Sequence, residues 1–368
     1  RGPADTVGAR ATGCLRARFR QVSALFRSLC VTLLILILIA AAVLWQGWGL
    51  YQGFLAEPID IAEETATLDI RPGATLRGVA MDLTQRGWLS NPYGFIALAY
   101  LTGQQNALKT GEYRISQGTR PVALLELLTS GRSIQFPVTL VEGTTFRDAV
   151  ATIADAGPFK IELAGLSDAE IMARIGIDAD HPEGWLFPDT YLFSRGTTDV
   201  EILTRAHRRM RQVLAEEWAE RSEDLPIDTP YEALILASII EKETAVPEER
   251  PAIAGVFVRR LQKGMRLQTD PTVIYGMGDE YDGNIRREDL REATPYNTYV
   301  ISGLPPTPIA LSGREAIHAA LHPADGDALY FVSRGDGSHH FSATLDEHNC
   351  AVRHYQLNRP CRALKEQP

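Results

Sequence analysis

One acidic side chain interrupts the most apolar helical pattern in the second half of the chain. The segment "YEALILASIIEKET" places Glu241 directly after Ile239 and Ile240. A charged carboxyl in such a segment is costly unless it is paired, protonated or used in chemistry. Glu241 therefore either begins the solvent-exposed end of a helix or is a catalytic acid. An apolar setting would favour the protonated form that a catalytic acid needs.

The spacing of residues 230–245 predicts a helix that positions this carboxyl. Ala237 and Ser238 precede Glu241 by four and three residues, so the three side chains share one face. Small residues on that face leave room for a ligand to approach the carboxyl. Glu243 lies about 200° around the same helix, and it is the alternative acid.

Two polar loops follow this helix in the segments "GMRLQTDPTVIYGMG" and "TPYNTY". The first holds Gln268 and Asp270, and the second holds Tyr296, Asn297 and Tyr299. Aromatic, amide and carboxyl side chains of this kind can stack on sugar rings and can hydrogen-bond hydroxyl and acetamido groups. The loops therefore favour a glycan groove next to the Glu241 helix.

An apolar run near the start predicts a membrane helix over residues 29–50. Residues 29–45 read "LCVTLLILILIAAAVLW", close to the ~20 apolar residues that span a bilayer. Six arginines and one aspartate precede the run, which predicts a cytoplasmic N-terminus and an exported remainder. A cleaved signal peptide is the competing interpretation.

Charge and cysteine content limit the classes of partner. The chain carries a formal charge of −9. Its first 28 residues hold about +5, which leaves about −14 for the rest of the chain. A negative charge of this size argues against nucleic acid as a partner. Cys350 and Cys361 could form a disulfide in an oxidising compartment, but their spacing does not decide the matter. We find no CxxC or HExxH motif that would suggest a metal.

The exported part is expected to be α+β. The segments at 66–89 and 138–157 both read as a strand, a glycine-containing turn and an amphipathic helix. Such modules resemble LysM-like carbohydrate-binding units, and a structural spacer is the alternative. The predicted divisions are a basic arm 1–28, a membrane helix 29–50, a linker 51–65, a LysM-like module 66–135, a catalytic domain 136–358 and a tail 359–368.

Six phrases occur in order along the chain: "EGWLFPDTY", "ASIIEKET", "GMRLQTDPTVIYGMG", "YNTY", "GLPPTPI" and "FSATLDEHN". With them the chain resembles the YceG-like family, the endolytic murein transglycosylases, from about residue 30 to 355. The segment "PIALSG" departs from the family pattern, which often has a proline before the glycine. The resemblance implies cleavage of the bond between N-acetylmuramic acid and N-acetylglucosamine within nascent peptidoglycan strands.

The resemblance also assigns residues and a location. Glu241 matches the catalytic glutamate of the family, with no metal or organic cofactor. Six residues match motifs expected to line the glycan groove: Gln268, Asp270, Tyr275, Tyr296, Asn297 and Tyr299. The implied setting is the inner membrane, with a periplasmic catalytic region in contact with peptidoglycan and the cell-wall synthesis machinery. A murein-binding scaffold without catalysis and a hydrolytic muramidase remain alternatives.

Overall fold

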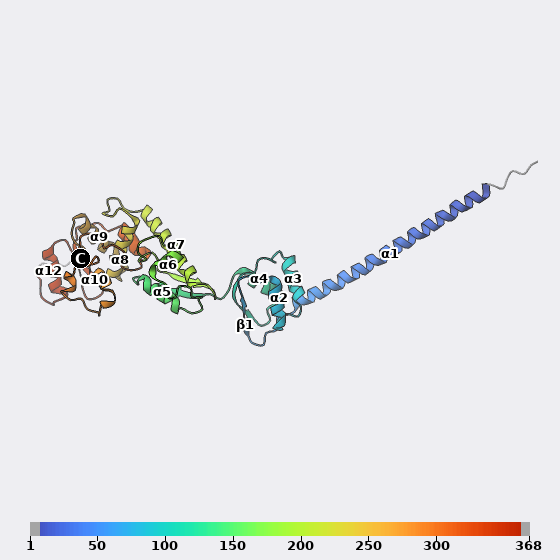
Figure 1. The fold of residues 1–368 in the computed structure, drawn as a ribbon, viewed down its shortest axis with the longest axis horizontal. Coiled ribbons are helices and arrows are strands. Elements are labelled where there is room, and N and C mark those ends of the chain that lie inside the picture. Colours follow the sequence, from blue (N-terminus) through green and yellow to red (C-terminus); the bar gives the residue numbers. More distant parts are fainter. Residues whose placement is uncertain (1–7, 362–368) are drawn as a thin grey trace, which may run out of the picture. The chain divides into compact units, whose positions relative to one another are not determined.

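The computed structural model describes residues 8–361, and side chains are described at residue 29 and from residue 31 onward. The chain divides into two compact units on either side of the Ile134–Gln135 bond, and both units appear in Figure 1. Helices and short strands are mixed in each unit, so the expected α+β class is confirmed. The first seven residues of the predicted arm and the last seven of the predicted tail lie outside the described residues.

The long first helix carries the predicted membrane segment. Helix α1 spans Gly8–Ala56, and its part Val31–Ala56 has 26 residues with a mean hydropathy of 2.2. That part is long and apolar enough to cross a bilayer, and it is the one such segment among the described residues. Near its end, Phe54 is buried in the core of the first unit, where Gly94 leaves space for its ring.

The first unit is a two-stranded sheet covered by helices. Its further elements are β1 (Thr65–Ile70), α2 (Leu76–Gln85), α3 (Pro92–Leu101), β2 (Gly111–Ser116) and α4 (Pro121–Ser130). The strands pair antiparallel, with Leu68 opposite Tyr113, and both side chains are buried in one core with the helices. The predicted strand, turn and amphipathic helix at 66–89 are thus confirmed.

The second unit is mostly helical. Its elements are β3 (Phe136–Thr139), α5 (Phe146–Asp155), α6 (Asp168–Ile175), β4 (Thr190–Phe193), α7 (Asp199–Ala219), α8 (Pro230–Glu243), η1 (Pro247–Glu249), α9 (Arg250–Gln262), α10 (Asp270–Met277), η2 (Gly278–Glu280), η3 (Asp289–Arg291), α11 (Arg314–Leu321), β5 (Tyr330–Ser333), β6 (His339–Ser342) and α12 (Leu345–Tyr355). Strands β3 and β4 pair antiparallel, as do β5 and β6.

Helix α8 lies at the centre of this unit. Thr229 and Glu232 form a capping box at its start, and Pro230 occupies the first turn, where no hydrogen bond is lost. Most of its residues are buried, and α7, α9, α10 and α11 all pack against it. The helix predicted over residues 230–245 is therefore confirmed, and it is the scaffold for the residues at its last turn.

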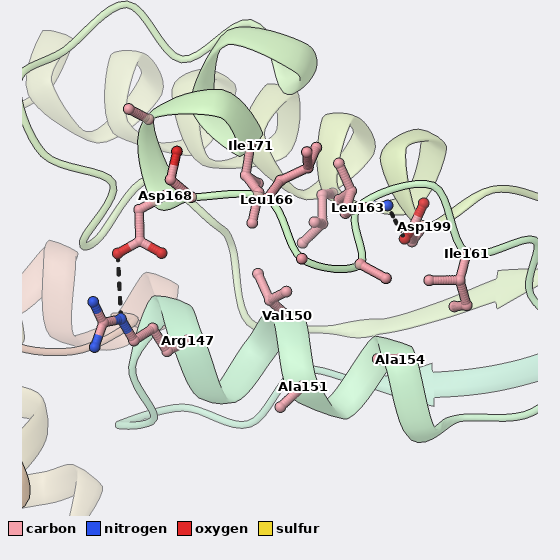
Figure 2. Close-up of a pocket in the computed structure, with 15 residues that line it drawn as sticks. Arg147, Val150, Ala151, Ala154, Ile161, Leu163, Leu166, Asp168, Ile171 and Asp199 are labelled. Carbon is pink, nitrogen blue, oxygen red and sulfur yellow. Dashed lines mark hydrogen bonds and ion pairs between the residues drawn. The ribbon is translucent and has the colours of Figure 1, made fainter.

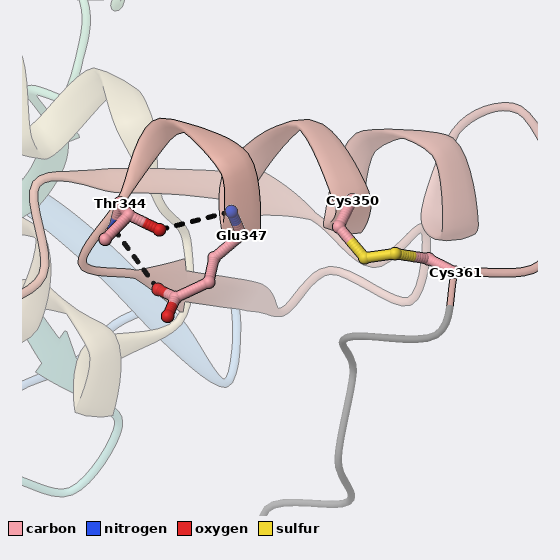
Figure 3. Close-up of a disulfide and its surroundings, with 4 residues drawn as sticks. All are labelled: Thr344, Glu347, Cys350 and Cys361. Carbon is pink, nitrogen blue, oxygen red and sulfur yellow. Dashed lines mark hydrogen bonds between the residues drawn. A yellow bond between two sulfur atoms is a disulfide. The ribbon is translucent and has the colours of Figure 1, made fainter.

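A disulfide joins the middle of α12 to the segment that follows the helix. Cys350 is bonded to Cys361, with their Cα atoms 5.5 Å apart, as Figure 3 shows. Cys350 is buried, whereas Cys361 is only partly buried. Thr344 and Glu347 form a capping box at the start of the same helix. The cap therefore holds the start of α12, and the bond ties the middle of the helix to the segment after it.

Replacing Cys361 with serine should lower the free energy of unfolding by up to about 3 kcal/mol, because the bond closes a short loop in the unfolded chain. Cys361→Ser leaves the buried Cys350 side chain in place, so no cavity is created. Chemical denaturation of oxidised wild type and variant, with thiol counting by alkylation and mass spectrometry, measures the effect. Two free thiols at these positions in the oxidised protein would contradict the bond.

Candidate active site

The last turn of α8 carries three consecutive charged residues that point in different directions. Successive helix residues lie about 100° apart, so each of these side chains meets a different part of the unit. Lys242 Nζ donates a hydrogen bond to the Gly143 carbonyl at 3.0 Å. The Glu243 carboxylate accepts one from the Thr269 hydroxyl. Glu241 turns toward α9 and the loop before α11.

Both oxygens of the Glu241 carboxylate have polar partners. Oε1 lies 3.2 Å from Nη2 of Arg250, the first residue of α9, and Oε2 accepts a hydrogen bond from the Gly313 N–H at 2.9 Å. Only 5% of the Glu241 side chain is exposed. The expectation of an apolar setting is therefore wrong, because Ile239 and Ile240 pack into the core on other faces of the helix.

The guanidinium of Arg250 is shared among three carboxylates. Besides Glu241, Nη2 lies 3.9 Å from Oε2 of Glu142, and Nη1 pairs with Glu315. The Arg250 side chain is 9% exposed, compared with 51% for Glu142 and 72% for Glu315. The cluster therefore extends from a buried end at Glu241 to solvent. Burial, followed by the charge of Glu241, raises the pKa of Glu142.

The small-residue face of α8 is covered by the protein's own chain. Ser238 Oγ accepts a hydrogen bond from the Ile309 N–H at 3.0 Å and donates one to the Ile235 carbonyl. Three residues after Ser238 on the same face, Glu241 binds the Gly313 N–H of the same loop. The room that we expected for a ligand is therefore occupied by the "PIALSG" segment, which also completes the carboxylate's contacts.

A cavity of about 560 Å³ lies beside this helix, and Lys242 is one of its lining residues. Two of the predicted groove residues, Tyr275 and Tyr296, also line it, with their rings edge-to-face at 5.0 Å between centroids. Glu241 is not among the described residues that line this cavity. A polar and aromatic lining of this kind suits a sugar ring.

Glu183 is a buried acid of this cavity that the sequence analysis did not select. It is only 3% exposed, and its carboxylate accepts hydrogen bonds from the Phe146 N–H at 2.8 Å and from the Tyr275 hydroxyl at 3.1 Å. Burial raises the pKa of Glu183 to about 7. The signal in the sequence was an acid followed directly by an apolar, turn-rich run in "EGWLFPDTY".

The predicted groove residues at 268, 270 and 299 lie in a different polar environment. Gln268 is exposed and has a left-handed backbone, with φ 51°, and its N–H donates to the Thr298 carbonyl at 3.1 Å. The Tyr299 hydroxyl donates to Oδ1 of Asp270 at 2.6 Å. The two loops are thus joined side chain to side chain, and their exposed groups are open to a ligand.

Asn297 and the alternative acid Glu243 have internal partners. Asn297 is buried, and its amide donates to the carbonyls of Asp289 at 2.9 Å and Glu292 at 2.7 Å. Burial raises the pKa of Glu243 to about 6, against the hydrogen bond from Thr269 that lowers it. The Asn297 side chain holds the loop together, and Glu243 ties α8 to the segment before α10.

An apolar cavity of about 690 Å³ lies between α5 and residues 161–171, as Figure 2 shows. Arg147 and Asp168 form an ion pair of 3.2 Å at its edge, and Asp199 accepts hydrogen bonds from the chain at Glu162 and Leu163. None of the predicted site residues lines it. Its mainly hydrophobic wall offers little for hydroxyl-rich sugars.

One group of side chains in the described part of the chain could hold a metal ion: Glu217, His318 and His322. The carboxylate of Glu217 already pairs with Arg314 through Oε1, and Oε2 lies 2.8 Å from Nδ1 of His318. Because both oxygens are engaged, we describe the group as a polar cluster between α7 and α11.

These features define a class: an α+β protein with one helix able to cross a membrane and a helical unit built around a buried, arginine-paired glutamate. The model of the YceG-like family matches residues 68–354, and the chain belongs to this family. A Bacillus subtilis (strain 168) protein named endolytic murein transglycosylase is 32% identical over 327 residues. That similarity covers 84% of this chain and 90% of the relative.

One further relative and one solved structure are also similar to this chain. An endolytic murein transglycosylase of Streptococcus pneumoniae (strain D39) is 27% identical over 329 residues, which are 79% of this chain but 59% of the longer relative. A solved yceG-like protein from Listeria monocytogenes is 28% identical, with a TM-score of 0.49 over 78% of this chain and 99% of that one. The family expected from the six sequence phrases is confirmed.

The raised pKa of Glu183 predicts a specific pH dependence of stability. The stability that this group contributes is fully present below about pH 4.5 and is lost as the pH rises through about 7. Relative to Glu183→Gln, which keeps the shape but does not ionise, wild type should lose about 3 kcal/mol across that window. Thermal unfolding of both proteins from pH 4 to 8 measures the difference.

Tyr275→Phe is the matched control for this effect. It keeps the Glu183 carboxyl but removes a hydrogen bond that favours the charged form, so the loss of stability should extend to higher pH. If the curves of wild type and Glu183→Gln run parallel from pH 4 to 8, Glu183 does not hold its proton in the folded protein.

Proposed function

We infer that this chain is an endolytic murein transglycosylase. It cleaves the β-1,4 bond between N-acetylmuramic acid and N-acetylglucosamine within peptidoglycan strands and leaves 1,6-anhydromuramic acid ends. The observation that carries this conclusion is the similarity to a relative of that name over 84% of this chain and 90% of the relative. The match of the family model over residues 68–354 supports it.

We assign the acid–base chemistry to Glu241. A glycoside hydrolase of the usual kind needs two carboxylates at a defined separation, whereas a lytic reaction can use one. Protonated Glu241 gives its proton to the glycosidic oxygen as the bond to the anomeric carbon breaks. The resulting carboxylate takes the proton of the muramyl 6-hydroxyl, whose oxygen bonds to the anomeric carbon. No water is consumed, and Glu241 is protonated again at the end.

Arg250 and Gly313 support the second half of this cycle. Their N–H groups bind the two oxygens of Glu241 at 3.2 and 2.9 Å, and such charge-assisted contacts stabilise the carboxylate left after proton donation. They also fix the direction of the Glu241 side chain, because they hold its two oxygens from two different sides. Arg250 is the first residue of α9, and Gly313 is the residue before α11. A fixed carboxylate is what a proton transfer at one position requires.

The substrate is proposed to contact the polar and aromatic residues near the end of α8. Tyr275 and Tyr296 in the 560 Å³ cavity offer faces for sugar stacking. The exposed Gln268 and the Asp270–Tyr299 pair offer hydrogen bonds to hydroxyl and acetamido groups. Asn297 contributes by holding the loop that carries the two tyrosines at 296 and 299.

The apolar part of α1 is proposed to anchor the enzyme in the inner membrane with a cytoplasmic N-terminus. The arginines before it support that orientation, and the Cys350–Cys361 bond suits an oxidising periplasm. The strand–helix–helix–strand order of β1, α2, α3 and β2 supports a LysM-like module that binds glycan. An anchored enzyme of this kind would act on nascent strands beside the cell-wall synthesis proteins.

Replacing Glu241 with glutamine should abolish cleavage, because the amide can neither give nor take the required proton. We expect a loss of about a thousandfold or more. Uncrosslinked, peptide-bearing glycan strands are incubated with wild type or Glu241→Gln and analysed by mass spectrometry. Internal fragments ending in 1,6-anhydromuramic acid are expected with wild type alone.

Glu243→Gln is the matched control, since it makes the same change two residues away on the same helix and should keep most of the cleavage. Wild-type cleavage by Glu241→Gln would rule out Glu241 as the catalyst. Reducing ends in place of anhydro ends would identify a hydrolytic muramidase, and intact strands retained by wild type would identify a binding scaffold.

A further inference from the structure

Two cavities of the second unit open along the same helix, α5. Its first residues, 146–148, line the 560 Å³ cavity that is proposed to hold sugar rings. Three residues further along α5 line the apolar cavity of about 690 Å³: Val150, Ala151 and Ala154. Arg147 and Asp168 line both cavities, so the two share an edge at the Arg147–Asp168 ion pair, which Figure 2 shows.

The wall of the apolar cavity that faces α5 is held in place by a buried carboxylate. Asp199 is 4% exposed and accepts hydrogen bonds at 3.0 Å from the N–H groups of Glu162 and Leu163. Leu163 and Leu166 face Val150 across the cavity in Figure 2. Because the backbone of this wall is fixed, the cavity is formed before a ligand enters, and little ordering is needed on binding.

The cavity offers open apolar surface inside and a charge at its edge. Ile161 is 41% exposed, and Ala151 and Ala154 are also exposed, so an apolar ligand that covers them gains free energy. The Arg147 side chain is 78% exposed, and its ion pair with Asp168 uses Nε. The two terminal nitrogens of a guanidinium can bind a second carboxylate side by side.

These features match the peptide that peptidoglycan strands carry. The stem peptide leaves the lactyl group of N-acetylmuramic acid, is rich in alanine and has an acidic residue near its sugar end. The order of sugar, carboxylate and methyl groups is the order of the polar cavity, Arg147 and the apolar cavity along α5. From Arg147 to Ala154 the helix rises about 10 Å, the length of about three residues of extended peptide.

We propose that the apolar cavity beside α5 is the subsite for the stem peptide of the glycan strand, with Arg147 binding the peptide's acidic residue. The inference rests on the proposed function, which supplies the peptide-bearing strand as the substrate. A lipid chain is the other apolar group of a nascent strand, but it is attached at one end of the strand. Cleavage within a strand instead places sugars and their peptides at the site.

The test compares peptide-bearing strands with the same strands after an amidase has removed their peptides. The full-length wild type in detergent should have a kcat/KM about tenfold higher on the peptide-bearing strands, the discrimination that a methyl group in an apolar pocket gives. Ala151→Phe places a ring in the cavity and should bring this ratio close to one. Thr152→Phe places the same ring on the next, exposed residue of α5, about 100° around the helix, and should keep the wild-type ratio.

Arg147→Gln tests the carboxylate contact separately. It breaks an exposed ion pair, which contributes little to stability. The ratio should fall about threefold below that of wild type on strands whose peptides keep the free acidic group. On strands in which that group is amidated, the two proteins should have the same ratio. An equal loss on both kinds of strand would overturn the role of Arg147.

A wild-type ratio of one, or a wild-type ratio in Ala151→Phe, would overturn the inference, while anhydro ends from both kinds of strand would leave the proposed function intact. A loss in Ala151→Phe confined to strands still joined to their lipid, with or without peptides, would identify a lipid chain as the occupant and also overturn it. If wild type releases no anhydro fragments from any strand, the proposed function fails and the inference falls with it.

Discussion

The buried guanidinium of Arg250 is the constraint on which the catalytic unit depends. An arginine side chain does not give up its charge inside a protein, so a guanidinium that is 9% exposed must be met by carboxylates. The carboxylates come from α8, from α11 and from the turn after β3. Satisfying one cation therefore joins α8 and α9, which are neighbours in the sequence, to the turn after β3 and to α11, which are distant from them. Removing one partner of such a buried pair typically costs several kcal/mol.

The same constraint shapes the chemistry. Glu241 is held by a cation and a backbone N–H, whereas Glu183 is held by the neutral Phe146 N–H and Tyr275 hydroxyl and has a pKa of about 7. The unit thus contains two buried acids, one beside a positive charge and one that contacts only neutral hydrogen-bond donors. Placing acids in contrasting environments is a general way to give them separate roles.

Local patterns predicted the elements well and their side-chain partners poorly. The spacing of apolar residues within a segment predicts its secondary structure. That local pattern predicted the membrane segment, the helix at 230–245 and the helix after Pro72-Gly73. The groove residues were expected to share one surface. In the structure Tyr275 and Tyr296 line a cavity, whereas Asn297 is buried in its own loop. Glu142 and Glu183 were not selected, because their partners lie far away in the sequence. Arg250 was not selected although Glu241 is nine residues away, because the spacing does not show that the chain turns back between α8 and α9.

The sequence by itself determined the α+β class, a helix able to cross a membrane at Val31–Ala56, the family and the helix that carries Glu241. Each of these depends on composition, on local spacing or on motifs that can be read in order. Only the tertiary structure decided what surrounds the Glu241 carboxyl: a guanidinium and a backbone N–H in place of the apolar setting expected from Ile239 and Ile240. Sequence neighbours on a helix point about 100° apart, so the environment of a side chain is set by the elements that fold against its face.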